Sequence, residues 1–183
     1  MNNEVFEITA EKYPVILDIR YASTNNVFDK VMYSDNRCYL NISMQEKFEE
    51  AVALAQEQGL MLKIFDTSRP LKVQQYMYDK FPGEFVSDPK TGSIPHCRGI
   101  AIDLTLADAN SNELNMGSDF DEFSELAFHS YENLDQEILD NRQLLLKIMT
   151  KAGWDFYDKE WWHYQDFNPR DTAILDLEGF SAV

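Results

Sequence analysis

The segment from Ile100 to Leu106 limits the possible folds more than any other part of this chain. Its sequence is IAIDLTL, and a glycine, Gly99, comes immediately before it. Alternating β-branched and apolar residues over so short a length are typical of a β-strand. Because a strand is stable only beside other strands, the rest of the chain must supply partners for it. The segment also carries one carboxylate, Asp103, among apolar neighbours.

Three further segments have the β-rich composition of strands. They are residues 15–21, 61–65 and 154–164, the last of which is aromatic and alternating. Predicted strands and helices interleave without a regular β-α-β period, which favours an α+β fold with a mostly antiparallel central sheet flanked by helices. No repeat and no Pro/Gly/Ser-rich linker divides the chain. We therefore predict a single domain over residues 1–183.

Three segments have the signals of helices. Ser43 and Glu46 have the spacing of a capping box, in which each side chain satisfies a backbone N–H at the start of a helix. Apolar residues recur behind them at helical spacing until Gly59. The other two predicted helices are residues 71–81, which follow Pro70, and residues 137–151, which end before Gly153.

The charge balance excludes some classes of partner. The chain has 16 Lys+Arg against 32 Asp+Glu, a formal net charge of −16. Nucleic acids and anionic membranes attract clustered cations and would be repelled by this field, so we expect neither as a partner. The chain also has 12 Phe, 9 Tyr and 3 Trp, whereas a disordered acidic chain would be poor in aromatic residues.

The N-terminal sequence and the cysteines favour a cytoplasmic location. The first residues show no basic segment followed by an apolar one, as a secretory signal would, and no apolar run approaches the ~18 residues of a membrane span. Cys38 and Cys97 are the only cysteines and are most simply interpreted as reduced thiols. A periplasmic chain trimmed of its signal would look the same, and one disulfide remains an alternative.

Two histidines have carboxylates at informative spacings. His96 precedes Asp103 by seven residues, and Glu160 precedes His163 by three. Two neutral imidazoles and one carboxylate would give one zinc ion three protein ligands and leave a fourth position open for water. Glu160 would then be the general base that accepts a proton from this water, and later the acid. Residues three or seven apart in an ideal strand face opposite sides, so a bulge, a strand end or a bend must bring them together.

Each of these residues also has a plainer interpretation. A single histidine or carboxylate is more often a core or surface residue than a ligand. Cys97 beside His96 suggests a thiol nucleophile, which we do not favour because only Arg98 would lower its pKa. Arg69 follows a strand and could stabilise an oxyanion. From the residues alone, a surface arginine paired with Asp66 is the simpler interpretation.

Several motifs occur in the order found in one family. They are DIRYASTNNV at residues 18–27, DTSRP at 66–70, SIPHCRGIAIDLTL at 93–106, MGS at 116–118 and EWWHY at 160–164. Together they resemble the zinc D-alanyl-D-alanine dipeptidases, the vancomycin-resistance dipeptidase-like branch of the D,D-carboxypeptidase-like metallopeptidases. The resemblance extends from about residue 17 to residue 164.

The resemblance implies a role for each matching residue. His96, Asp103 and His163 would bind one zinc ion per chain. Glu160 would be the general base and acid, and Arg69 would stabilise the tetrahedral intermediate. Asp121 would pair with the free α-amine of the substrate, and Tyr21 would line the pocket. The implied activity is hydrolysis of D-alanyl-D-alanine, or of a related short dipeptide that contains D-amino acids. A carboxylate that binds a free ammonium rejects an N-terminally extended chain, and this would make the enzyme a dipeptidase.

Two positions depart from the family pattern. Thr67-Ser68 stands where Gly-Tyr is frequent, and Ile94-Pro95 where Ser-Ser is frequent, which bears on substrate preference rather than on hydrolysis. His129 matches no ligand position and is interpreted as a helix-surface histidine. The alternatives are a carboxypeptidase or endopeptidase of longer cell-wall peptides, and a zinc- or peptide-binding module without catalysis. The oligomeric state, and the choice among antibiotic resistance, D-alanine salvage and peptidoglycan turnover, are not predicted.

Overall fold

The computed structural model describes residues 4–83, 85–166 and 172–180. Its strands are β1 Val5–Glu7, β2 Val15–Leu17, β3 Tyr39–Asn41, β4 Met61–Asp66, β5 Ala101–Ala107, β6 Asp155–Phe156 and β7 His163–Gln165. Its α-helices are α1 Gln45–Glu57, α2 Leu71–Lys80 and α3 Gln136–Lys151. Short 3-10 helices occur at Arg20–Ala22, Ile42–Met44, His96–Arg98, Glu125–Ala127 and Glu178–Phe180.

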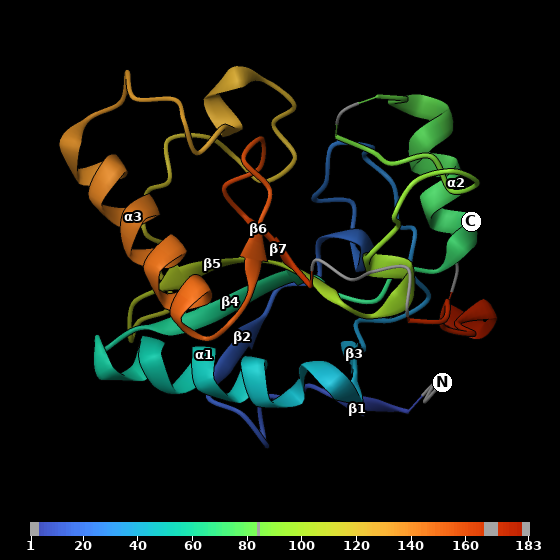
Figure 1. The fold of residues 1–183 in the computed structure, drawn as a ribbon, viewed down its shortest axis with the longest axis horizontal. Coiled ribbons are helices and arrows are strands. Elements are labelled where there is room, and N and C mark those ends of the chain that lie inside the picture. Colours follow the sequence, from blue (N-terminus) through green and yellow to red (C-terminus); the bar gives the residue numbers. More distant parts are fainter. Residues whose placement is uncertain (1–3, 84, 167–171, 181–183) are drawn as a thin grey trace.

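The central sheet has five strands in the order β2-β4-β5-β7-β6, and β1 and β3 form a separate antiparallel pair. The predicted α+β fold with a mostly antiparallel sheet is confirmed. The sheet is mixed, however, because β2 pairs with β4 in parallel. In Figure 1, α1 and α3 lie along the lower and left sides of the sheet, whereas α2 lies apart from them at the upper right.

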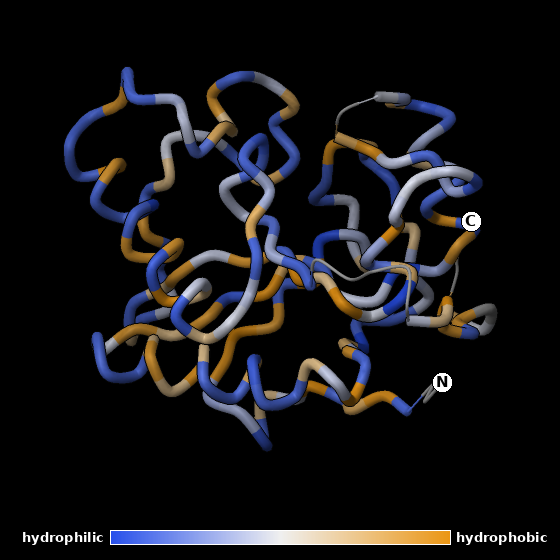
Figure 2. Tube along the Cα trace, in the orientation of Figure 1, coloured by the Kyte–Doolittle hydropathy of each residue, from blue (hydrophilic) through white to orange (hydrophobic). Residues whose placement is uncertain are grey.

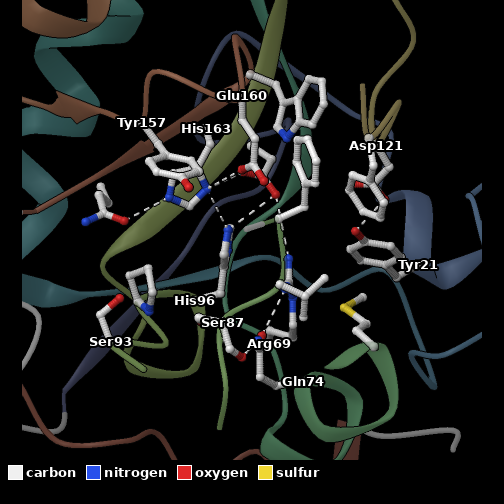
Figure 3. A pocket seen from close by; sticks show the side chains of 18 of the residues that line it. Tyr21, Arg69, Gln74, Ser87, Ser93, His96, Asp121, Tyr157, Glu160 and His163 are labelled. Carbon is white, nitrogen blue, oxygen red and sulfur yellow. Dashed lines mark hydrogen bonds and ion pairs between the residues drawn. The ribbon is translucent and has the colours of Figure 1, made fainter. Parts of the chain in front are cut away.

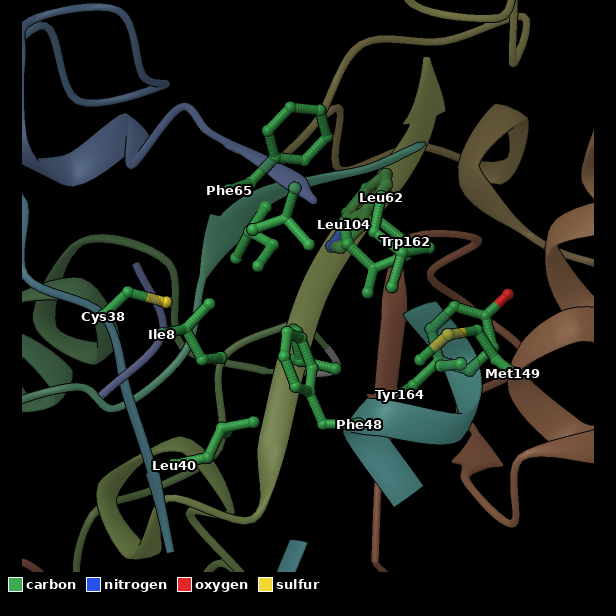
Figure 4. Packing of buried hydrophobic residues seen from close by; sticks show 14 of the residues in the cluster. Ile8, Cys38, Leu40, Phe48, Leu62, Phe65, Leu104, Met149, Trp162 and Tyr164 are labelled. Atoms are coloured by element: carbon green, nitrogen blue, oxygen red, sulfur yellow. The ribbon is translucent and has the colours of Figure 1, made fainter. Parts of the chain in front are cut away.

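One face of the central sheet is apolar and is covered by helices. Ile102 and Leu104 of β5 lie on this face, and Tyr164 of β7 pairs with Ile102. Figure 4 shows Phe48 of α1 and Met149 of α3 close to the same cluster, and both side chains are fully buried. Figure 2 shows that hydrophobic residues concentrate along the central strands, whereas the peripheral loops are hydrophilic. The predicted strand over 100–106 is thus the buried centre of the fold.

The opposite face of the same strands carries polar side chains. Asp103 pairs in register with His163, so alternation along both strands turns these two side chains away from the helices. The β4–β5 register shifts between Ile64 and Asp66. This β-bulge moves Asp66 from the apolar face to the polar face, opposite Asp103. The sheet therefore has a helix-covered apolar face on one side and, on the other, a polar site set among further buried apolar residues such as Phe65 and Phe120.

The predicted strand over 154–164 is wrong as one element, because it is a hairpin of β6 and β7. Between them the Glu160 N–H donates to the Tyr157 carbonyl and the His163 N–H donates to the Glu160 carbonyl. The Trp161 N–H donates outside the hairpin, to Ala127. Turn bonds thus replace strand pairing over these residues. Likewise, the predicted strand over 15–21 ends at Leu17 and gives way to a 3-10 turn.

The helix predictions are confirmed within a few residues, but the capping box is wrong. The Ser43 backbone N–H and hydroxyl both donate to the Asn41 side chain, which starts a 3-10 turn before α1. The first residue before α1 is Met44, whose side chain makes no cap hydrogen bond. Gly59 ends the helix with φ +71°, as expected.

His129 is not a helix-surface residue. It lies between the 3-10 helix at 125–127 and α3, and its ring packs against those of Phe156 and Tyr164. Burial lowers the pKa of His129 to about 4. Both Cys38 and Cys97 are free and buried, so the single disulfide is not formed. Within the described residues, none of the helices combines the length and apolar character needed to span a bilayer.

Candidate metal centre and substrate cavity

His96, Asp103 and His163 converge on the polar face of the sheet. The Asp103 carboxylate lies 2.9 Å from His163 Nδ1 and 3.3 Å from His96 Nε2, and the two nitrogens lie 3.2 Å apart. All three side chains are buried. Figure 3 shows His96 and His163 pointing toward one another, with Glu160 above them. One nitrogen or oxygen from each residue could therefore bind the same metal ion.

Local backbone structure resolves the predicted spacing problem. Asp103 and His163 face each other across paired strands, whereas His96 comes from the 3-10 turn that precedes β5. Gly99 ends that turn with φ +67°, a conformation that favours glycine. A Cβ at this position would lie 2.7 Å from Leu175 Cδ1. Glu160 lies in the turn before β7, so strand alternation does not separate it from His163.

The outer nitrogens of both histidines have oxygen partners. His96 Nδ1 lies 2.6 Å from the Thr67 carbonyl oxygen, and His163 Nε2 lies 3.0 Å from Gln165 Oε1. These oxygens accept hydrogen bonds, so the outer nitrogens carry the protons and the inner nitrogens of the neutral rings present lone pairs. Two lone pairs then point toward a carboxylate, an unfavourable arrangement that a bound cation would relieve. The donor set therefore fits a metal ion.

Burial and neighbouring charges affect the two carboxylates next to the histidines differently. Burial alone would raise the pKa of Asp103, but His96 and His163, whose protonated rings would bring positive charge and hydrogen-bond donors to it, outweigh burial and hold that pKa below its usual value. With the neutral rings that metal binding requires, the bound cation would supply that charge instead. Burial raises the pKa of Glu160 to about 8, although His163 acts in the opposite direction. Glu160 Oε2 lies 3.7 Å from His163 Nδ1. The Asp103 carboxylate is thus held in its charged form, whereas the Glu160 carboxylate readily binds a proton near neutral pH.

Arg69 is paired with Asp66, as the simpler interpretation expected, but it is buried rather than on the surface. Its Nε and Nη2 donate to Asp66 Oδ2 at 3.0 and 2.8 Å, and its Nη1 donates to Gln74 Oε1 at 3.0 Å. Nη2 also lies 3.7 Å from Asp103 Oδ2. Burial disfavours the charged guanidinium, yet Asp66 and other neighbours keep the pKa of Arg69 above its usual value. A permanent positive charge therefore lies beside the candidate metal ligands.

Asp121 and Tyr21 lie across the cavity from the histidines, at the right of Figure 3. The Tyr21 hydroxyl donates to Asp121 Oδ2 at 2.6 Å, and both residues are buried. Burial raises the pKa of Asp121 to about 7, although the hydrogen bond from Tyr21 acts in the opposite direction. Asp121 also has φ +61°, which is unusual for a residue with a side chain.

All seven predicted site residues line one cavity of about 300 Å³. Aromatic side chains complete its wall, among them Phe85, Phe123 and Trp162. The neighbouring Trp161 does not line the cavity and instead donates through Nε1 to Ser118 Oγ at 2.9 Å. A cavity of this size matches the small end of ligand sites.

Sequence reasoning missed the residues that support the site. Gln165 lies two residues after His163 in β7, and period-two alternation could have placed it on the same face. Asp66 was considered only as a surface partner of Arg69, and no local pattern indicates the bulge that turns it inward. Tyr33, whose hydroxyl donates to Asp66 Oδ1 at 2.6 Å, carried no signal at all.

The thiol-nucleophile alternative finds no support in the geometry. Cys97 is fully buried and does not line the cavity. Burial raises the pKa of its thiol to about 12, although Arg69 acts in the opposite direction. A thiol in this state is neutral at physiological pH and inaccessible to a substrate.

Comparison with known proteins agrees with this geometry. Residues 12–174 match a family model described as D-ala-D-ala dipeptidase. The chain is 35% identical over 150 residues to the D-alanyl-D-alanine dipeptidase of Escherichia coli (strain K12), which covers 81% of this chain and 77% of the relative. It is 32% identical over 168 residues to the D-alanyl-D-alanine dipeptidase of Enterococcus faecium, covering 80% of this chain and 83% of the relative. The chain therefore belongs to the D-Ala-D-Ala dipeptidase family of metallopeptidases.

Proposed function

We propose that this protein is a zinc-dependent dipeptidase that hydrolyses D-alanyl-D-alanine or a related short dipeptide containing D-amino acids. The observation that carries the proposal is the shared cavity of about 300 Å³. On one side of the cavity, the inward lone pairs of His96 and His163 and the charged carboxylate of Asp103 suit a metal ion. On the other side, the buried carboxylate of Asp121 suits a free ammonium. Dipeptidases of this name among the relatives support the same substrate.

His96, Asp103 and His163 are the residues that would bind the metal. Two imidazoles and one carboxylate are a frequent ligand set of catalytic zinc, and they leave one position open. Bound zinc would polarise the scissile carbonyl and make an attacking water more acidic. Gln165 and the Thr67 carbonyl hold the two rings in the tautomer that this ligand set requires.

Glu160 is the general base and, later, the general acid. Its carboxylate lies beside His163 at the wall of the cavity, where it can accept a proton from the attacking water. The same carboxyl group can then deliver that proton to the leaving amine, so no covalent intermediate is required.

Arg69 stabilises the negative charge that develops on the carbonyl oxygen. Its guanidinium lines the cavity and lies beside Asp103. Asp66 and Gln74 hold it in place before a substrate binds, so little reorganisation is needed as the charge develops.

Asp121 binds the α-ammonium of the dipeptide, and the Tyr21 hydroxyl orients its carboxylate. An N-terminal extension would bring a neutral amide to this position and leave the buried carboxylate without a cation, which penalises longer peptides. This contact favours a dipeptidase over a carboxypeptidase or endopeptidase of longer cell-wall peptides.

Substitution Glu160→Ala tests the proposal. We expect the variant to bind zinc at the wild-type ratio and to lose nearly all hydrolysis of D-alanyl-D-alanine, because the base is not a ligand. Glu132→Ala, at an exposed carboxylate, is the matched control and should retain full activity. Wild-type turnover by Glu160→Ala would show that the base is misassigned. A zinc-loaded wild-type protein that hydrolyses no dipeptide would favour a non-catalytic binding module.

A further inference from the structure

A buried arginine joins the two ends of the segment that carries Asp121. This segment, residues 116–128, runs from Met116 to the 3-10 helix Glu125–Ala127 and Phe128, and it places Asp121 at the cavity. It has no strand pairing of its own, and its single 3-10 turn lies near its end. Contacts from outside the segment must therefore fix where Asp121 lies.

Arg142 of α3 supplies these contacts. Its Nε donates to the Met116 carbonyl at 2.6 Å, its Nη2 to the Leu126 carbonyl at 2.6 Å and its Nη1 to the Phe128 carbonyl at 3.0 Å. One guanidinium thus joins the two ends of the segment. The Arg142 side chain is buried, yet it forms no ion pair with any carboxylate in the part of the chain that the structure describes.

A buried cation with no carboxylate in ion-pair contact is costly, and the more distant Glu122 only partly offsets this cost, so the carbonyl partners of Arg142 indicate a specific role. Burial lowers the pKa of Arg142 to about 10, but the side chain stays charged at neutral pH. Hydrogen bonds from a charged donor are stronger than those between neutral groups, and here three carbonyl dipoles take the place of a directly paired carboxylate. An ordinary core residue at this place would leave these carbonyls unsatisfied.

The same segment is tied to the turn that carries Glu160. Trp161 donates through its indole Nε1 to Ser118 Oγ at 2.9 Å and through its backbone N–H to the Ala127 carbonyl at 2.9 Å. Arg142 also lies over the Trp161 ring, with 6.0 Å between the guanidinium carbon and the ring centroid. Arg142 therefore affects how Asp121 is placed relative to Glu160.

Asp121 itself requires such support, since its φ of +61° is strained for a residue with a side chain. We propose that Arg142 is a positioning residue for substrate-amine recognition, which closes the 116–128 segment and so holds Asp121 at the distance from the metal centre that suits a dipeptide. This inference rests on the proposed function and adds to it the residue that sets the dipeptide length.

The variant Arg142→Met tests the proposal by steady-state kinetics on the zinc-loaded enzyme. We expect KM for D-alanyl-D-alanine to rise about tenfold, while kcat changes less than about threefold, because the ammonium contact is weakened whereas Arg142 donates no hydrogen bond to Glu160 or to the proposed metal ligands. The preference for the free dipeptide over N-acetyl-D-alanyl-D-alanine should fall by a similar factor. A loss of kcat with unchanged KM and unchanged preference would overturn the proposal.

A double-mutant cycle shows whether Arg142 acts through Asp121. In an Asp121→Asn background, Arg142→Met should raise KM less than about twofold further, because the contact that it positions is already lost. Fully additive effects would indicate a general structural role and contradict the proposal. Should Arg142→Met fail to fold, Arg142→Lys decides, since it keeps the charge but its single nitrogen cannot reach the three carbonyls that three guanidinium nitrogens contact, and it should show the same KM rise.

Asn141→Ala is the matched control. Asn141 is the neighbour of Arg142 on α3 and donates to the Asn115 carbonyl at 3.0 Å, just outside the 116–128 segment. Its removal should leave KM and the free-amine preference unchanged, and an effect equal to that of Arg142→Met would contradict the proposal. If the wild-type enzyme cleaves neither substrate, the proposed function fails, whereas an active wild type with an unaltered Arg142→Met variant overturns only the positioning role.

Discussion

Asp121 is a carboxylate that the fold keeps away from water, and this placement destabilises its charged form. Burial raises its pKa from 3.8 to about 7. A carboxyl group whose pKa is higher in the folded protein than in the unfolded chain stabilises the fold below pH 4, and this contribution is lost as the pH rises through 7. We interpret this loss of stability as a consequence of the binding function. A buried, charged carboxylate that can bind a substrate ammonium is unfavourable as long as no ammonium is bound.

Asp121→Asn should therefore stabilise the substrate-free protein at pH 8, by on the order of 2–4 kcal/mol at most. The amide oxygen can still accept the hydrogen bond from Tyr21. The difference in melting temperature between variant and wild type should grow from pH 4 to pH 8, and hydrolysis should fall sharply. An equal or lower melting temperature for Asp121→Asn at pH 8 would show that the carboxylate is not destabilised by burial.

Gln165 is a neutral residue that affects zinc binding, although it is not itself a candidate ligand. Its side-chain oxygen accepts from His163 Nε2 and so keeps Nδ1 turned toward His96 and Asp103, the other candidate metal ligands. Gln165→Ala should weaken zinc binding about 10- to 100-fold, as loss of a hydrogen bond behind a ligand usually does. Competition with a chromophoric chelator measures this. Gln75→Ala, on the exposed side of α2, is the control and should bind zinc as the wild type does.

At the scale of elements, the turn that ends at Gly99 connects the histidine His96 to the strand that carries Asp103. Gly99 has φ +67°, and an added Cβ would lie 2.7 Å from Leu175 Cδ1 and 2.9 Å from the Asn41 backbone nitrogen. Gly59 has φ +71° with no atom within 4 Å of an added Cβ. The two glycines thus separate backbone strain from steric overlap.

Gly59→Ala should cost about 1 kcal/mol of unfolding free energy, from conformational strain alone. Gly99→Ala should cost clearly more, on the order of 2–4 kcal/mol, because the Asn41 backbone cannot move aside easily. Gly99→Ala should also weaken zinc binding, since His96 is displaced. Urea denaturation of both variants measures the difference, and equal costs would show that the close approach at Gly99 is unimportant.

The elements also show what a sequence can predict. The helices and the strand over 100–106 were predictable because their apolar periodicity is local to each segment. The hairpin over residues 154–164 was not predictable. Alternating aromatic residues occur in strands, but also in turns whose side chains are buried against other segments, so the pattern does not distinguish the two. The bulge at Asp66 arises from the pairing of β4 with β5, which the sequence of β4 alone does not reveal. The cap comes from Asn41, two residues before the Ser43 that the capping-box spacing indicated.

The candidate site was predictable for a different reason. The seven residues that resemblance assigned all line one cavity, although the residues alone favoured a surface position for Arg69. The supporting residues could not be identified in the same way. Arg142 acts through backbone carbonyls, and Asp66 reaches the site through a bulge. Both contacts depend on the three-dimensional arrangement rather than on motif spacing.

At the scale of the whole molecule, the candidate metal centre joins distant parts of the chain. His96 and His163 are 67 residues apart, yet their inner nitrogens lie 3.2 Å apart. A metal that binds only the folded state stabilises it by about 2.7 kcal/mol when the free ion is at a hundredfold excess over the dissociation constant. Chelation should therefore lower the melting temperature of the zinc-loaded protein by several degrees.

Thermal denaturation with and without a chelator measures this stabilisation. His163→Ala should show no difference between the two conditions, because a ligand is missing. His129→Ala, at a histidine that does not belong to the candidate ligand group, should keep the wild-type difference. Loss of the difference in His129→Ala alone would place the metal elsewhere.

The central claim is that one cavity combines a metal centre with a carboxylate that binds a free ammonium. The most direct test is the specificity constant of the zinc-loaded enzyme for D-alanyl-D-alanine, L-alanyl-L-alanine and N-acetyl-D-alanyl-D-alanine, compared with that of the chelated protein. The account predicts that zinc-dependent cleavage of D-alanyl-D-alanine exceeds that of the N-acetylated dipeptide by at least about a hundredfold, because acetylation removes the ammonium and leaves Asp121 buried without a cation. Equal cleavage of the free and N-acetylated dipeptides, or full activity after zinc removal, would contradict it.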